Sequence, residues 1–142
     1  MEFINFLMEL EEKTSAGCIV LSDESVLIVK NKKISCSFPK GHIKEGESYF
    51  DCAQRELFEE TGLCVKDLEF VKDLGFIERL DGYSKTTKKI YYFLFYTDKE
   101  KELGGLDEDN EAYWVKRGKA EEILSYEEER DLFRRFCSSF FY

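Results

Sequence analysis

The chain has 142 residues, of which 43% are hydrophobic and 15% aromatic. This length and composition fit one globular domain spanning residues 1–142, with a core of its own, and they exclude an intrinsically disordered chain. The formal net charge is −9 and the sequence pI is near 4.8. That balance argues against a protein that coats nucleic acid, whose surface is usually basic, so we expect no nucleic-acid partner.

The cysteines and the N-terminus bear on the cellular compartment. The five cysteines are odd in number and no two have CxxC spacing, so we expect neither a disulfide framework nor a zinc knuckle. The first 13 residues are acidic where a signal peptide would be basic. No apolar run approaches the roughly 18 residues that a membrane span requires. We therefore expect a cytoplasmic protein with no membrane partner, present as a monomer or a weak dimer.

Short apolar runs alternate with polar turns in the first part of the chain. Residues 15–21 and 26–31 are typical of two buried strands joined by a turn at 22–25. Residues 34–38 form a short extended piece, and 40–46 are expected to be a glycine-bounded loop.

A helix is predicted to follow this loop. Ser48, with Asp51 three residues later, matches a capping box. Apolar residues then recur at helical spacing at Phe50, Ala53 and Leu57. Gly62 fits the left-handed position that commonly ends a helix.

The second half of the chain is expected to hold three strands and a broken helix. In chain order we predict a strand at 68–80 with a bend at Gly75, a polar loop at 81–89, a strand at 90–97, a charged loop at 98–111, a strand at 112–116, and a helix at 120–136 that breaks near Ser125. Strands around one central helix, with more helix at the end, indicate an α+β fold built as a sandwich.

Three glutamates raise the question of function. Glu56, Glu59 and Glu60 lie on one face of the predicted helix. The like-charge pair Glu56 and Glu60 costs about 0.2–0.5 kcal/mol. Glu59 and Glu60 also lie at the negative end of the helix dipole, which destabilises the helix by about 0.3–1 kcal/mol for each residue. A hard divalent cation would reverse these costs, because Mg²⁺ binds carboxylate oxygens together with substrate phosphates. The alternative is a solvated acidic face, as charge runs usually are.

The sequence around these glutamates resembles the Nudix box. That motif is a glycine, five residues, Glu, seven residues, then Arg-Glu-apolar-x-Glu-Glu-x-Gly-apolar. Residues 41–63, GHIKEGESYFDCAQRELFEETGL, match every fixed position. The resemblance implies an α/β/α sandwich with a mixed sheet and a catalytic loop–helix–loop. It also implies Mg²⁺ or Mn²⁺ as the cofactor, and hydrolysis of a nucleoside diphosphate linked to another moiety.

The resemblance gives each matched side chain a role. Glu56 and Glu60 would be the principal metal ligands, and Glu59 would be a further ligand or would hold the nucleophilic water. Glu47 would support the metal site, and Arg55 would orient the carboxylates through charge-assisted bonds. The cation would lower the pKa of the attacking water and neutralise phosphate oxygens.

Further stretches are similar to the asymmetric diadenosine tetraphosphate hydrolases of this family. SFPKGHIKEGE (37–47) looks like their Pro-Lys-Gly-His segment, and here the Gly41 carbonyl would be another metal ligand. GYSKTTKKIYYFLF (82–95) resembles their tyrosine-and-lysine loop ahead of an aromatic strand. DEDNEAYWV (107–115) resembles their acidic loop ahead of a tryptophan strand.

Cations and one aromatic residue are candidates for binding the substrate. Lys40, Lys85, Lys88 and Lys89 fall in two predicted loops of an acidic protein, and a polyphosphate chain would need such contacts. Tyr83 would stack on a purine, an interaction worth about 1–3 kcal/mol. The alternatives are lysines that serve solubility and a tyrosine that covers the core.

Two further candidates rest on the resemblance. His42, the only histidine, would contact phosphate or support the site, where on its own it would be an ordinary loop or packed residue. Glu108 and Glu111 precede Trp114 by six and three residues. The family often takes one more carboxylate from this loop as metal ligand or general base, and Glu108 matches better by its distance from Trp114. The alternative is a solvated acidic run.

These observations predict a Mg²⁺- or Mn²⁺-dependent pyrophosphohydrolase with a small-molecule nucleotide substrate. The leading expectation is the cleavage of diadenosine tetraphosphate into ATP and AMP. Other substrates in the same chemistry are a nucleoside triphosphate, ADP-ribose, an RNA 5′ end or an inositol pyrophosphate. A different class is a non-catalytic nucleotide sensor on this fold, which would have no need to keep every metal-site carboxylate.

Overall fold

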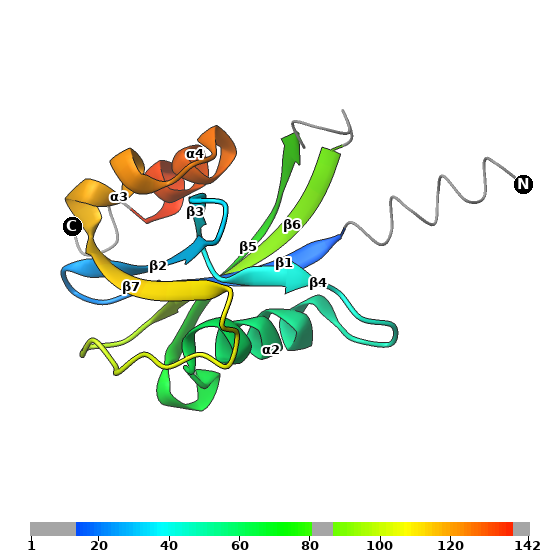
Figure 1. Cartoon of the computed structure of the whole chain (residues 1–142), viewed down its shortest axis with the longest axis horizontal. Helices are drawn as coiled ribbons and strands as arrows, with labels where there is room; N and C mark the ends of the chain where they lie inside the picture. Colours follow the sequence, from blue (N-terminus) through cyan, green and yellow to red (C-terminus); the bar gives the residue numbers. More distant parts are fainter. Residues whose placement is uncertain (1–13, 81–86, 138–142) are drawn as a thin grey trace, which may run out of the picture.

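A mixed β-sheet lies between one helix on one face and two helices on the other (Figure 1). The computed structural model describes residues 14–80 and 87–137. The strands are β1 (Ser15–Leu21), β2 (Ser25–Asn31), β3 (Cys36–Ser37), β4 (Lys40–His42), β5 (Glu69–Leu80), β6 (Thr87–Tyr96) and β7 (Asn110–Lys116). The helices are α2 (Tyr49–Thr61), a 3₁₀ turn η1 (Val65–Asp67), α3 (Arg117–Ile123) and α4 (Glu127–Phe136). The predicted α+β sandwich is confirmed.

The strand order places the β3–β4 segment beside the centre of the sheet. The main path runs β3-β2-β1-β6-β5, with β4 paired to β1 and β7 paired to β2. Only β1 and β6 run parallel among these pairs. The chain from β3 to β4 pairs first with β2 and then with β1. Lys40, Gly41 and His42 are therefore held by the central strand.

Two apolar layers fill the sandwich. β1 is buried along its whole length, as expected of a strand covered on both faces. In β6, Ile90, Tyr92 and Leu94 pack toward α3 and α4, whereas Phe93 and Phe95 pack toward α2. The period-2 alternation of a strand produces this division. It places the acidic helix and the C-terminal helix on opposite faces of the sheet.

Three of the predicted loops are wrong in part. The last two residues of the predicted loop 98–111 belong to β7, whose backbone pairs with β2. Residues 40–42 form strand β4, because their backbone pairs with residues 15–17 of β1. The last three residues of the predicted loop 81–89 belong to β6, where Lys89 lies opposite Glu78 and Lys88 opposite Arg79. The polar sequence at 87–89 predicts a loop. These residues are nevertheless strand, because pairing with β5 outweighs their local propensity. Lys88 and Lys89 are thus on a strand and not in a loop.

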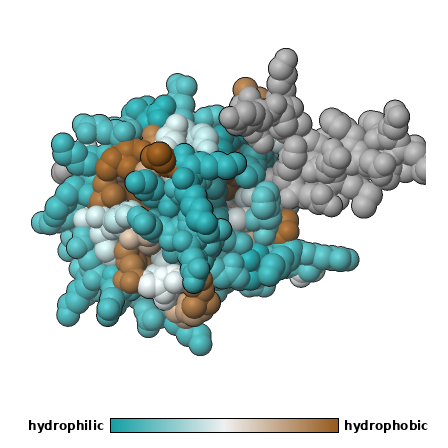
Figure 2. All heavy atoms as spheres, in the orientation of Figure 1, coloured by the Kyte–Doolittle hydropathy of each residue, from teal (hydrophilic) through white to brown (hydrophobic). Residues whose placement is uncertain are grey.

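The surface is mainly hydrophilic on the face that Figure 2 draws, with small hydrophobic patches. Exposed apolar side chains such as Ile34 and Leu106 are 75% and 70% accessible, and scattered residues of this kind are ordinary on a protein surface. Within residues 14–80 and 87–137, no helix is long and apolar enough to span a membrane.

Candidate active site

Helix α2 presents the acidic face, and its ends are fixed as the sequence predicts. The Ser48 side chain accepts a hydrogen bond of 3.0 Å from the Asp51 amide at the start of the helix. Gly62 ends it with φ of 79°, a left-handed conformation that glycine adopts without strain. The buried positions Cys52, Ala53, Leu57 and Thr61 anchor the helix. Arg55 and the three glutamates are consequently left on the open side.

Arg55 connects three carboxylates through one guanidinium. Its Nε and Nη2 donate to the two oxygens of Glu47 at 2.7 and 3.0 Å. Its Nη1 lies 2.7 Å from Glu56 Oε1 and 3.2 Å from Glu59 Oε2, and Nη2 also donates to the His42 carbonyl at 3.0 Å. These bonds lower the pKa of Glu47 to about 2 and raise the pKa of Arg55. The arginine therefore joins Glu47, Glu56 and Glu59 in one ion-pair cluster.

Glu60 lies on the side of the site formed by β4. The Lys40 amide donates to Glu60 Oε2 at 3.2 Å. Burial raises the pKa of Glu60 to about 8, the Lys40 charge opposes this shift, and the negative charges of Glu56 and Asp107 add to it. A desolvated carboxylate of this kind is stabilised in its charged form by a nearby cation.

Gly41 allows β4 to approach Glu56 closely. A Cβ atom at Gly41 would lie 2.1 Å from the carboxyl carbon of Glu56, so no other residue fits there without displacing that side chain. The Gly41 carbonyl also accepts a 3.4 Å bond from Cys52 Sγ. Sequence reasoning did not single out Cys52, since its position within the motif is not one of the fixed ones.

The donors at this place fit a hard divalent cation. The carboxylates of Glu56, Glu59 and Glu60 and the carbonyl of Gly41 supply the oxygen ligands that Mg²⁺ and Mn²⁺ prefer, and the Gly41 backbone leaves room beside Glu56. In the described part of the chain, no three acidic, His or Cys side chains already converge on one point. Because Arg55 engages Glu56 and Glu59, binding a cation requires these side chains to rearrange.

Those predicted substrate-binding residues that the structure describes lie toward one end of the sheet. Ser15 pairs with His42 on one side and with Ile90 on the other. Lys88 and Lys89 directly precede Ile90, so they lie near the same end as His42. The Nζ atom of Lys89 is 4.3 Å from the centre of the Phe76 ring. Tyr83 and Lys85 lie outside the described residues.

The acidic loop before β7 is tied to the end of α2. The amides of Leu106 and Asp107 donate to the Glu59 carbonyl at 2.8 and 3.1 Å. This contact brings the Asp107 charge close enough to raise the pKa of Glu60. Asp107 was missed in the sequence, and its only signal there is membership of the same acidic run as Glu108.

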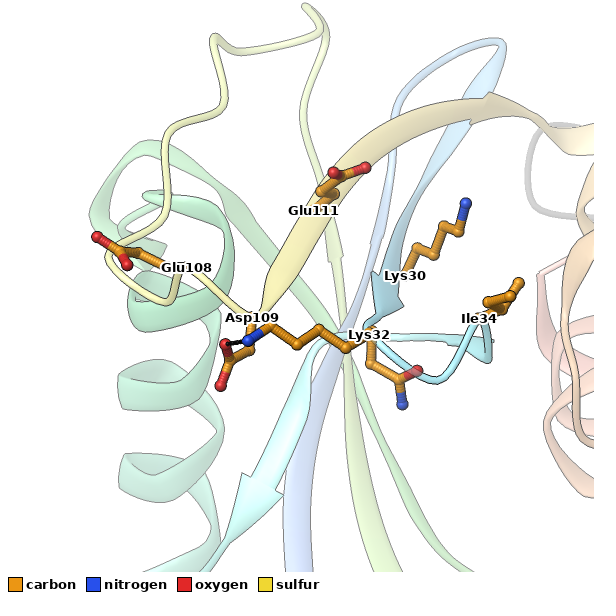
Figure 3. A pocket seen from close by; sticks show the side chains of 7 residues that line it. Lys30, Lys32, Ile34, Glu108, Asp109 and Glu111 are labelled. Atoms are coloured by element: carbon orange, nitrogen blue, oxygen red, sulfur yellow. Dashed lines mark ion pairs between the residues drawn. The ribbon is translucent and has the colours of Figure 1, made fainter.

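Glu108 and Glu111 line a neighbouring cavity of about 340 Å³, which also touches Lys30 and Lys32. Lys32 pairs with Asp109 at 2.6 Å, and Figure 3 shows Glu108 turned away from this pair. Glu111 lies on β7, where its carboxylate accepts a bond from Tyr113. Of the two glutamates, Glu108 follows directly on the segment bonded to α2.

The curated proteins that match this chain include an enzyme with a named activity. The 8-oxo-dGTP diphosphatase of Buchnera aphidicola subsp. Acyrthosiphon pisum (strain APS) is 34% identical over 77 residues, which are 53% of this chain. The aligned part spans 58% of that protein's length.

Many solved structures share the fold. A C. elegans Ap4A hydrolase, in a binary complex, has a TM-score of 0.75 and 21% identity, covering 87% of this chain and 93% of that one. The E. coli dihydroneopterin triphosphate pyrophosphohydrolase has a TM-score of 0.74 and 16% identity, covering 87% and 94%. The model of the NUDIX domain matches residues 11–136. Nearly the whole described sandwich lies within that match, and the chain belongs to the Nudix family.

Proposed function

We propose that this Nudix protein is a Mg²⁺- or Mn²⁺-dependent pyrophosphohydrolase of dinucleoside polyphosphates, which splits diadenosine tetraphosphate into ATP and AMP. The observation that carries the proposal is the position of β4. It places Lys40 against Glu60 and Gly41 against Glu56, so a cationic segment borders the carboxylates of α2. A phosphate chain would meet cation ligands and lysine side by side.

The end of the sheet supports a long phosphate chain as substrate. Lys88 and Lys89 lie near the same end of the sheet as His42. In a protein of net charge −9, lysines at one end of the sheet would offset the charge of several phosphates. The fold shared with the C. elegans Ap4A hydrolase is compatible with this substrate class.

Each residue of the site has a distinct task in the proposed reaction. Glu56, Glu60 and the Gly41 carbonyl would hold the cation, which supplies positive charge to acidify a water and to neutralise phosphate oxygens. Arg55 and Glu47 hold the carboxylates in place. The Glu59 side chain is 40% exposed, against 15% for Glu56, and we assign it to accept the proton of the attacking water.

Product analysis tests the proposal. The protein would be incubated with diadenosine tetraphosphate and MgCl₂, and the nucleotides separated by ion exchange, with ADP-ribose and nucleoside triphosphates in parallel. We expect ATP and AMP, formed only with the metal. Turnover of another substrate alone would overturn the dinucleotide assignment. Absence of any metal-dependent turnover, with nucleotide binding retained, would favour the sensor.

A second candidate substrate is a nucleoside triphosphate. The observation in its favour is the Buchnera 8-oxo-dGTP diphosphatase, which is 34% identical over the aligned part. The same chromatogram separates the two proposals, because a triphosphate substrate would yield a monophosphate and pyrophosphate.

Two variants test the carboxylate from the acidic loop. The Asp107 charge acts on Glu60, whereas Glu108 lines the adjacent cavity. If Glu108, and not Glu59, is the general base, Glu108→Gln lowers kcat by about 10²–10⁴-fold and Asp107→Asn lowers it less. The reverse order would transfer that role to Asp107. Asp109→Asn, which removes only the exposed pair with Lys32, serves as the control.

A further inference from the structure

Glu129 of α4 is a buried carboxylate that the proposed reaction does not use. It is 0% exposed. Its Oε1 accepts bonds from the Tyr92 hydroxyl at 2.9 Å and from Arg79 Nη1 at 3.1 Å. The guanidinium of Arg79 in turn lies 3.7 Å from the centre of the Tyr126 ring. Three elements of the sandwich, β5, β6 and α4, thus meet at one carboxylate.

A buried carboxylate at position 129 stabilises the core less than an apolar side chain would. Its Oε2 is buried and accepts no hydrogen bond of ordinary geometry from the described residues, and such a weakly satisfied buried oxygen is unfavourable. Replacing a buried ion pair by neutral groups of similar volume is often neutral or stabilising. Stability alone therefore does not account for a charge at position 129.

A series of contacts connects Glu129 with the candidate active site. The Tyr92 ring packs edge-on against Phe38 with 5.5 Å between centroids, and Phe38 stacks on Phe133 of α4 at 6.4 Å. Two residues after Phe38, the Lys40 amide donates to Glu60. Burial raises the pKa of Glu129, while the Lys40 and Arg79 charges and the Phe38 backbone oppose that shift. Glu129 and Glu60 therefore approach segment 38–40 from α4 and α2, respectively.

A second connection runs through Arg79. This residue lies opposite Lys88 in the β5–β6 register, and its side chain is only 10% exposed. Fixing Arg79 against Glu129 therefore also fixes the backbone pair that carries Lys88, one of the cations proposed to bind phosphate.

We propose that Glu129 is a positioning residue, which holds segment 38–40 and the Arg79–Lys88 pair so that the Lys40 amide meets Glu60. The inference rests on the proposed function for its effect on turnover, but not for its effect on the Lys40 amide. On this proposal, Glu129 serves the geometry of the candidate site and not the stability of the fold.

The variant Glu129→Gln tests this role, because it keeps an acceptor for Tyr92 and removes the charge. We expect a lower thermal midpoint, because Arg79 is left buried without its ion partner. In assays below that midpoint, kcat should be about tenfold lower and the Mn²⁺ Kd, measured by electron paramagnetic resonance, about tenfold higher. Glu128→Gln, on the same helix, should change none of these. A wild-type kcat and Kd in Glu129→Gln would overturn the proposal, as would a fraction of unfolded protein at the assay temperature that accounts for the lost activity.

Tyr92→Phe is the second variant, since it removes one donor and keeps the ring against Phe38. Its effect on the Mn²⁺ Kd should be in the same direction and less than additive with Glu129→Gln. Strict additivity would show that the two residues do not act as a unit and would count against the proposal.

Amide hydrogen exchange at Lys40 keeps this test apart from that of the proposed function. In the metal-free protein without substrate, exchange at Lys40 should be about tenfold faster in Glu129→Gln, as expected on loss of one hydrogen bond. Faster exchange in Glu129→Gln, together with a wild-type protein that cleaves no nucleotide, would sustain the positioning role and overturn the enzymatic one. Unchanged exchange would overturn the positioning role, whatever the turnover.

Discussion

Arg55 connects more of the candidate site than any other described side chain. Its guanidinium bonds to Glu47, Glu56 and Glu59, and to the backbone of the loop at His42. A planar fork with several donors can serve two carboxylates of different orientation at once, which a lysine ammonium cannot. The residue thus joins two carboxylates of α2 and one from the preceding loop into a single ion-pair cluster.

Arg55→Lys should lower kcat about 10–100-fold, the usual cost of losing a residue that orients metal ligands. The charge is retained, so the loss would reflect geometry. Steady-state kinetics with the best substrate would measure it. Arg134→Lys is the matched control, because Arg134 is 60% exposed and pairs with Glu121 and Asp131 at the surface. Equal effects of the two substitutions would contradict the orienting role.

The raised pKa of Glu60 predicts how the stability of the metal-free protein depends on pH. The folded-state pKa is about 8, above the ordinary value of 4.5, so the folded state binds this proton more tightly than the unfolded state. The resulting stabilisation is complete below pH 4.5 and is lost as the pH rises through about 8. In EDTA, thermal midpoints should fall from pH 5 to 9, and Glu60→Gln should make that fall smaller. A Glu60→Gln profile parallel to wild type would contradict this assignment.

At the level of elements, the two ends of α2 place the acidic face. The N-terminal cap at Ser48 and the left-handed Gly62 fix its length. Beyond Gly62, the Gly104 amide returns to bond the Thr61 carbonyl at 2.9 Å. The helix end therefore also sets where the acidic loop begins.

Gly62→Ala should lower the free energy of unfolding by at least about 1–2 kcal/mol, because a Cβ is unfavourable in the left-handed region. A Cβ there would also lie 2.7 Å from the Gly104 carbonyl oxygen. Urea denaturation would measure the change. Gly118→Ala is the control, since Gly118 lies in α3 with open space around it, and alanine should add about 0.5–1 kcal/mol there. Similar losses at both glycines would contradict this explanation.

For the whole molecule, a cation at the candidate site should stabilise the fold by binding only the folded state. At a free Mg²⁺ concentration of 100 times Kd the gain would be about 2.7 kcal/mol. Differential scanning calorimetry should show a higher thermal midpoint with Mg²⁺, reversed by EDTA. Glu56→Gln combined with Glu60→Gln should abolish the shift, whereas Glu24→Gln, at an exposed pair with Lys116, should keep it. A shift that survives the double substitution would place the cation elsewhere.

Local signals made the elements and most of the acidic cluster predictable. The strand at 15–21, the helix with its Ser48 cap and Gly62 end, and the break near Ser125 follow from apolar period and capping chemistry, and all are confirmed. Helical spacing also placed Glu56, Glu59 and Glu60 on one face. The start of β6 at Thr87 and the strand at Lys40 could not be seen, because partners distant in the sequence create them.

By itself, the sequence determined the family motif, the sandwich class and the oxygen-rich chemistry of α2. The motif and the acidic face depend on residues close together in the chain, and the class follows from the order of the strands and helices. Only the tertiary structure decided that Lys40 and Gly41 lie against Glu60 and Glu56, that the Asp107 charge acts on Glu60, and that Tyr92 bonds the buried Glu129. These contacts join residues far apart in the chain. Their positions depend on strand register and on which face of the sheet each helix covers, and no local pattern encodes either.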